Sequence, residues 1–105
     1  MTATKSLDVQ IADIAHEMLS GKVGLVEGSR QLVQLFGRLD ERDDELLAPI
    51  IALESETDDL PLGEVRLHWS EEALQRKDAA VADYLREVRA EILKTCEALV
   101  RRYSN

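Results

Sequence analysis

The chain has 105 residues, of which 45% are hydrophobic and 32% are charged, and this size and composition predict one domain with a substantial core. A net charge of −8 and a pI near 4.7 argue against a nucleic-acid-binding protein, which needs a clustered basic face. No apolar run is long enough to predict a membrane span, Met1 to Ser6 shows no signal-peptide pattern, and the single cysteine, Cys96, favours the reducing cytoplasm as the compartment.

The first helix is expected from Leu7 to Ser20. Ser6 is a typical N-cap residue, and Gly21 stands where a residue with a left-handed backbone often ends a helix. Most apolar residues of this segment gather on one helical face, and His16 falls on the opposite face, where it is expected to be a surface residue. The apolar face comprises Leu7, Ile11, Ile14, Ala15, Met18 and Leu19.

A second amphipathic helix is expected from about Val23 to Leu39. Its apolar side comprises Leu25, Leu32, Val33, Leu35, Phe36 and Leu39. Gly28 lies inside this segment, where a glycine costs up to about 1 kcal/mol, so it predicts the close approach of a neighbouring helix. A phosphate-binding turn at Gly24 and Gly28 is the alternative, but the spacing and the lysine of such a loop are missing.

The segment from Asp40 to Glu64 carries the excess charge. It contains ten carboxylates and one basic residue, Arg42, so its charge is −9 and the rest of the chain sums to +1. Like charges this close repel one another, which predicts either solvent exposure or a cationic partner. The carboxylates are Asp40, Glu41, Asp43, Asp44, Glu45, Glu54, Glu56, Asp58, Asp59 and Glu64.

Within this segment, residues 40–45 are expected to form a turn that leads into a short buried helix. Pro49 lacks an N–H and would clash inside a helix, so the helix is expected to start near Ala48 or to kink there. A loop is expected from Glu54 to His68, because this stretch contains Pro61 and Gly63.

The last helix has the most distinct pattern. Ser70 is a typical N-cap, two glutamates follow it, and Trp69 and Leu74 stand at the two positions of a hydrophobic staple. No glycine or proline occurs beyond this point, which predicts one straight helix of about 32 residues, about 48 Å long. An apolar stripe with a period near 3.6 residues follows this helix and comprises Leu74, Val81, Leu85, Val88, Ile92, Cys96, Leu99 and Tyr103.

The first two expected helices are each only about 23 Å long and leave half of this stripe uncovered. Either the third helix and the long loop cover the rest, or a second copy does, in a homodimer through the C-terminal helix. Asp78 also lies on the stripe. Either this end of the helix is less buried, or Asp78 has a specific partner such as Arg66, since an unpaired buried carboxylate is costly.

Motifs for catalysis or metal binding are mostly missing. The two histidines, His16 and His68, come without cysteine pairs, which excludes the usual zinc sites. Residues 54–65 begin like a calcium loop, but Asp59 replaces the required glycine and Val65 replaces the final glutamate. Cys96 lies on the apolar stripe and is expected to be a buried, inert thiol. No metal or cofactor is therefore expected.

One enzyme pattern is weakly present. Helical nucleotide pyrophosphatases bind magnesium through pairs of carboxylates spaced i, i+3 on two helices, and Glu41/Asp44 and Glu56/Asp59 have this spacing. Both pairs are expected in turns or loops, however, and the long helix offers no such pair. A magnesium-dependent nucleotide hydrolase is therefore only a second alternative, and the chain is not expected to be an enzyme.

Two short motifs resemble a known group of proteins. Glu27-Gly28-x-Arg30-x-Leu32, and the run S-E-T-D-D-L-P-L-G at residues 55–63 followed by Arg66 and Trp69, resemble a family of small bacterial proteins that share a domain of unknown function. The resemblance covers roughly Ile11 to Leu99 and implies no particular activity. In general character, small acidic helical bacterial proteins are similar to immunity proteins and antitoxins, which is an analogy of class.

The sequence thus predicts an all-α fold, a helical bundle of three shorter helices packed on one long C-terminal helix. The leading functional hypothesis is an acidic binding protein that neutralises a cationic protein partner, most concretely an immunity protein or antitoxin that blocks a bacterial toxin. A regulatory or adaptor protein without a toxin is the alternative. The expected partner-binding residues join the carboxylates of the loop to its Arg–His–Trp cluster, because Arg and Trp dominate interface hot spots; they are Glu54, Glu56, Asp58, Asp59, Glu64, Arg66, His68 and Trp69.

Overall fold

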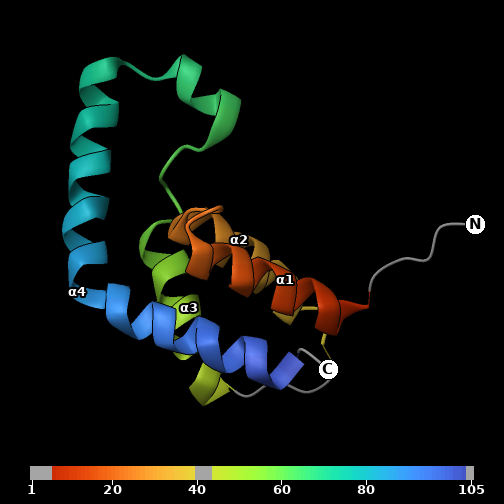
Figure 1. Cartoon of the computed structure of the whole chain (residues 1–105). Coiled ribbons are helices and arrows are strands. Elements are labelled where there is room, and N and C mark those ends of the chain that lie inside the picture. The colour runs from red at the N-terminus through yellow and green to blue at the C-terminus, as the bar shows by residue number, and fades with distance from the viewer. Residues whose placement is uncertain (1–5, 40–43, 104–105) are drawn as a thin grey trace, which may run out of the picture.

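The chain forms an all-α structure, as its periodicity predicts. A computed structural model describes residues 6–39 and 44–103, and these residues contain helices and no strand (Figure 1). In chain order the elements are α1 (Leu7–Ser20), α2 (Leu25–Phe36), α3 (Asp44–Glu56), the 3-10 helix η1 (Gly63–His68) and α4 (Glu71–Tyr103). No helix in this part of the chain combines the length and the apolar character needed to cross a membrane.

The first helix has the predicted bounds and caps. The Ser6 hydroxyl accepts a hydrogen bond from the Val9 N–H at 3.3 Å, and Gly21 has the left-handed φ of 80°. The second helix is shorter than predicted, because Gly24 and Gly37 flank it at its two ends. Gly28 is buried against the side chain of Met18 in α1, which confirms the predicted close approach of two helices.

The third helix differs from its prediction. It begins at Asp44, so Pro49 lies inside it and the expected start near Ala48 is wrong. A proline at this position removes one ladder bond, the one to the Glu45 carbonyl. Tertiary packing compensates for that loss, because the side chains on one face of α3 are completely buried: Leu47, Ile50 and Leu53. Of the turn expected at residues 40–45, residues 40–43 lie outside the described residues.

The long C-terminal helix bends sharply near its middle instead of running straight (Figure 1). A straight helix of its 33 residues would be about 50 Å long, which exceeds the largest extent of the molecule, 44 Å. Only the second half of α4 reaches the centre of the core, where Ile92, Thr95, Cys96 and Leu99 are buried. The bundle core is otherwise built from α1, α2 and α3, and α4 packs most extensively on α1.

The first half of α4 and η1 form an arm, residues 63–87, that continues beyond the three shorter helices (Figure 1). On this arm the apolar stripe of α4 is only half-buried, at Leu74, Val81 and Leu85. Residues 63–68, expected in a loop, instead form η1, which starts at Gly63 with a φ of 64° and contains no buried residue. The chain therefore holds residues 57–68, which follow α3, in a defined shape at one end of the bundle.

Candidate functional site

Arg30 of α2 fastens residues 57–60, which directly follow α3, to the bundle. One guanidinium nitrogen of Arg30 donates to the carbonyl oxygens of Thr57 and Leu60, at 2.5 and 2.6 Å. Thr57 is itself buried, and its hydroxyl donates to the Leu53 carbonyl at 2.7 Å. These bonds add a charged donor to backbone carbonyls just after the end of α3, of which the Thr57 carbonyl also accepts the Leu60 N–H at 3.0 Å. The segment thus leaves the bundle from a fixed point.

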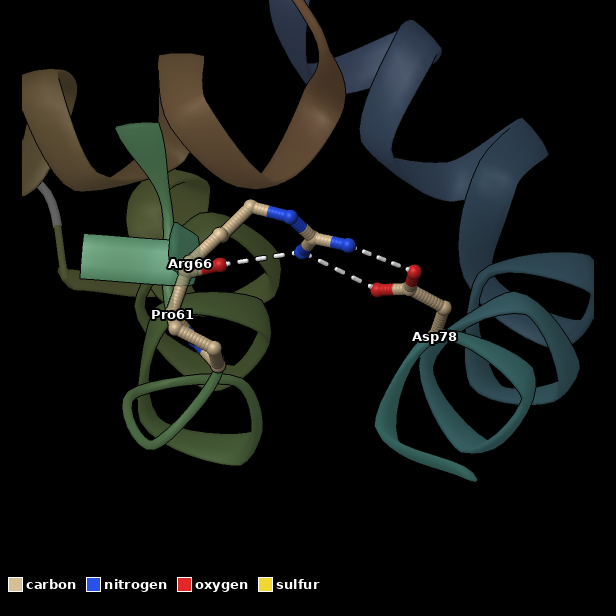
Figure 2. A network of polar contacts seen from close by, with 3 residues as sticks. All are labelled: Pro61, Arg66 and Asp78. Atoms are coloured by element: carbon tan, nitrogen blue, oxygen red, sulfur yellow. Dashed lines mark hydrogen bonds and ion pairs between the residues drawn. The ribbon is translucent and has the colours of Figure 1, made fainter. Parts of the chain in front are cut away.

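A second arginine holds the arm together. Arg66 of η1 donates to both carboxylate oxygens of Asp78 in α4, at 2.7 and 3.2 Å, and to the Pro61 carbonyl at 3.1 Å (Figure 2). The hydrogen bond from Arg66 lowers the pKa of Asp78 and raises the pKa of Arg66 itself. The Asp78 side chain is 49% exposed, so both ideas about this residue hold: it lies at a less buried end of α4 and it pairs with Arg66.

Lys77 brings together two further predicted site residues. Its ammonium group donates to Asp59 at 2.7 Å and lies 5.4 Å from the ring centroid of Trp69. The hydrogen bond from Lys77 lowers the pKa of Asp59. The sequence reasoning missed Lys77, since its contact with Asp59 spans 18 residues of the chain. The only sequence signal was its place one residue before Asp78, on the face that carries the stripe.

The remaining predicted carboxylates are not neutralised within the bundle. Glu56, Asp58 and Glu64 are exposed, Glu54 is half-buried, and none of the four forms an ion pair with a described residue. His68 is exposed at the end of η1. The predicted site residues therefore fall into two groups: those with a side-chain contact to α4, which are Asp59, Arg66 and Trp69, and those for which no such contact is found among the described residues.

Exposed apolar side chains accompany the free carboxylates. Leu67 is 84% exposed, Val65 is 56% exposed and Trp69 is 37% exposed, and these three account for all but one of the large exposed apolar side chains among the described residues. The sequence reasoning singled out Trp69 alone. Apolar and basic residues alternate from Val65 to Trp69, and this pattern could have indicated that Val65 and Leu67 are exposed as well. The segment was expected to be a loop, however, and a loop prediction does not indicate which side chains share a face.

A cleft of about 260 Å³ lies where the acidic segment meets the first half of α4. Its walls are Glu56, Thr57, Asp59, Leu60, Lys77, Ala80, Val81 and Tyr84. Burial, and then the charges of Glu56, Glu91 and Glu87, raise the pKa of Tyr84. The cleft thus joins an apolar floor to negatively charged walls, a lining suited to binding a cationic or amphipathic group.

The two carboxylate pairs of the enzyme alternative are only partly described. Asp59, half of the Glu56/Asp59 pair, accepts a hydrogen bond from Lys77, and Glu41 of the other pair lies outside the described residues. No cluster of three or more His, Cys, Asp or Glu side chains arranged for a metal ion occurs within residues 6–39 and 44–103.

Comparison with known proteins adds no relative: no protein-family model matches the chain, and neither a curated protein nor a solved structure matches it significantly.

Proposed function

We propose that this chain is a binding protein that docks on a basic protein surface through residues 54–69. The observation that carries the proposal is that one short segment exposes both carboxylates without an ion pair to a described residue and large apolar side chains: Glu56, Asp58 and Glu64, and Val65 and Leu67. The carboxylates would be stabilised by the positive charges of a basic partner, and the apolar side chains by burial against an apolar centre on its surface.

The arrangement matches the division of labour at protein interfaces. Exposed carboxylates at a rim speed the encounter with a cationic partner, and a central aromatic or aliphatic anchor slows its release. Trp69 and Leu67 are the candidate anchors, and Lys77 already holds one position of the Trp69 ring. Because the arm is fixed by the Arg66–Asp78 and Lys77–Asp59 pairs, little conformational freedom would be lost on binding.

In its most specific form, the proposal is an immunity protein or antitoxin that covers the cationic active site of a bacterial toxin. Toxins that act on phosphates or nucleic acid need basic active sites, and a preformed acidic surface complements such a site. A regulatory or adaptor protein would use the same surface on a basic partner without toxic activity. The two differ in what the partner does, and both are non-enzymatic.

The test uses a charge-reversed variant, Asp58→Lys with Glu64→Lys, because both side chains are exposed and unpaired among the described residues. A matched control reverses two exposed carboxylates that line no cleft with residues 54–69, Asp8→Lys with Glu97→Lys. A partner captured on the immobilised wild type is purified, and its association rate is measured by surface plasmon resonance at about 50 and 150 mM salt.

We expect the first variant to associate at least about tenfold more slowly at low salt, and the control to associate as the wild type does. Trp69→Ala should instead raise the dissociation rate. Equal association rates for the charge-reversed variant and the wild type would show that the carboxylates are only solvated. The partner is a toxin if cells that express it stop growing and if co-expression of the wild-type chain, but not of the charge-reversed variant, restores growth. A partner that does not affect growth supports the adaptor.

A further inference from the structure

The exposed face of α3 is apolar where a solvated helix is usually polar. Ala48 and Ala52 are exposed, Pro49 is half-exposed, and no charged side chain separates them. Glutamates stand at the two ends of this face, Glu45 and Glu56. Since the opposite face of α3 is fully buried in the core, the apolar residues of the outer face have no packing role there.

The N-terminal half of α4 supplies a second wall opposite this face. Ala48, Pro49 and Ala52 share a cleft of about 300 Å³ with Tyr84 and Val88 of α4. Tyr84 also lines the 260 Å³ cleft at the end of α3, so the two clefts are neighbours that share this side chain. The two clefts are together called the α3/α4 groove, and their lining residues on α3 extend from Glu45 to Glu56. These 11 helical steps measure about 17 Å, three turns of a helix.

Unpaired carboxylates line this groove. Glu45, Glu56 and Glu91 all contribute to its walls, and none forms an ion pair with a described residue. Glu56, Glu91 and Glu87 act together on Tyr84, whose raised pKa reflects burial first and then these negative charges. In the lining of these two clefts Lys77 is the one cation, and it is bound to Asp59. Lys94 and Arg101 line an adjoining cleft beyond Glu45 and Glu91. The middle of the groove is therefore apolar and negatively charged.

We propose that the α3/α4 groove binds an amphipathic helix with an apolar face and lysine or arginine flanks, contributed by the basic partner. This inference rests on the proposed function and specifies the form of the partner's docking segment. A helix of about three turns matches the groove in length, its apolar face would cover Ala52, Tyr84 and Val88, and its basic flanks would meet Glu45, Glu56 and Glu91. A second copy of this chain is disfavoured as the occupant, because each copy carries a net charge of −8.

The probe is a fluorescein-labelled helical peptide of about 14 residues, with leucines on one face and lysines on the other. A peptide of the same composition in scrambled order is the control ligand. Ala52→Glu makes the protein more acidic but places a carboxylate inside the groove, while Ala82→Glu makes the same change at an exposed alanine of α4 outside the groove lining. Dissociation constants come from fluorescence anisotropy, and circular dichroism checks that both variants fold.

We expect Ala52→Glu to weaken peptide binding at least about tenfold and Ala82→Glu to leave it unchanged or slightly tighter, because an apolar helix face cannot bury the new carboxylate. Nuclear magnetic resonance shifts on peptide binding should centre on Ala48, Ala52 and Tyr84. If charge alone attracts the peptide, Ala52→Glu should bind it more tightly, and that result would overturn the inference. Equal binding of the scrambled peptide, or no binding of the amphipathic peptide, would overturn it as well.

Failure of this inference and failure of the proposed function are separable. Asp58 and Glu64 do not line the groove, so reversing their charges tests the docking surface of residues 54–69 alone. If the natural partner responds to Asp58 and Glu64 but not to Ala52→Glu, the chain is an acidic binding protein whose groove stays empty, and the inference fails while the proposed function stands.

Discussion

Arg30 and Thr57 lie 27 residues apart in the sequence, yet a guanidinium nitrogen of Arg30 donates to the Thr57 carbonyl at 2.5 Å. The same nitrogen donates to the Leu60 carbonyl. Arg30 belongs to the E-G-x-R-x-L motif and Thr57 and Leu60 belong to S-E-T-D-D-L-P-L-G, so this contact joins the two short motifs singled out in the sequence. These motif residues thus have a structural role, which is to fix the point from which the acidic segment and the arm depart.

Replacing Arg30 with Gln should destabilise the protein by about 2–3 kcal/mol, because a glutamine cannot reach both carbonyls and leaves partly buried acceptors without a charged donor. Urea unfolding followed by circular dichroism measures the change. Arg89→Gln is the matched control, since Arg89 is exposed on α4, and it should change the free energy of unfolding by less than about 0.5 kcal/mol. Equal stabilities of the two variants would contradict the role given to Arg30.

Local sequence signals predicted those helix ends at which a capping residue or a glycine decides where the helix begins or ends. Ser6 and Gly21 define α1, and Ser70 begins α4 by accepting the Ala73 N–H at 3.1 Å. Of the two possibilities that the sequence left for Pro49, a helix start near Ala48 is wrong, because burial outweighs the proline penalty, a tertiary effect that no local pattern records. The bend of α4 was missed for a related reason: the helix has no glycine or proline at which a bend could be expected.

Most residues of the candidate site could be predicted from the sequence, but the contacts between them could not. The concentration of carboxylates could be read from charge alone, and Arg66 was named as a partner of Asp78 in one of the two alternatives for this residue. The Lys77–Asp59 contact and the Arg30 bonds join residues far apart in the chain, so they depend on how the helices pack. The groove was unpredictable for the same reason, since its two walls belong to helices brought together only by the fold.

Gly28→Ala should destabilise the protein by about 1–2 kcal/mol, although alanine favours helices. A Cβ at this position would overlap the Met18 side chain, which is 2% exposed and has little room to move. Gly37→Ala is the matched control, because a Cβ there meets backbone oxygens no closer than 3.5 Å at an ordinary φ of −63°. The melting temperature should fall for Gly28→Ala only. A rise for both variants would show that α1 and α2 can separate without cost.

Cys96 should resist thiol reagents in the folded protein. Its side chain is completely buried, its sulfur lies 3.9 Å from the Met18 sulfur, and burial raises its pKa to about 11. At about pH 8 the thiol is therefore protonated, and iodoacetamide should react only after unfolding in concentrated urea. Met18→Ala should accelerate labelling under native conditions, because a cavity in the core costs about 2–5 kcal/mol and makes opening more frequent. Rapid labelling of the native wild type would contradict this prediction.

Acid should loosen the arm through its two anchored carboxylates. Asp59 and Asp78 both have a lowered pKa, because Lys77 and Arg66 donate hydrogen bonds to them. A lowered pKa in the folded state means that the stabilisation is fully present above the unfolded value, about 4, and is lost as the pH falls through the folded values. Trp69, the only tryptophan and a neighbour of Lys77, reports the change by fluorescence.

We therefore expect the Trp69 emission of the wild type to shift as the pH falls below about 4, before the helical signal in circular dichroism is lost. A variant with Asp59→Asn and Asp78→Asn should show the shifted emission already at neutral pH, because neither ion pair can form. Asp58→Asn is the matched control: Asp58 is the exposed neighbour of Asp59 and has no ion pair with a described residue, so its emission should follow the wild type. If the double variant also follows the wild type at every pH, the two ion pairs do not hold the arm.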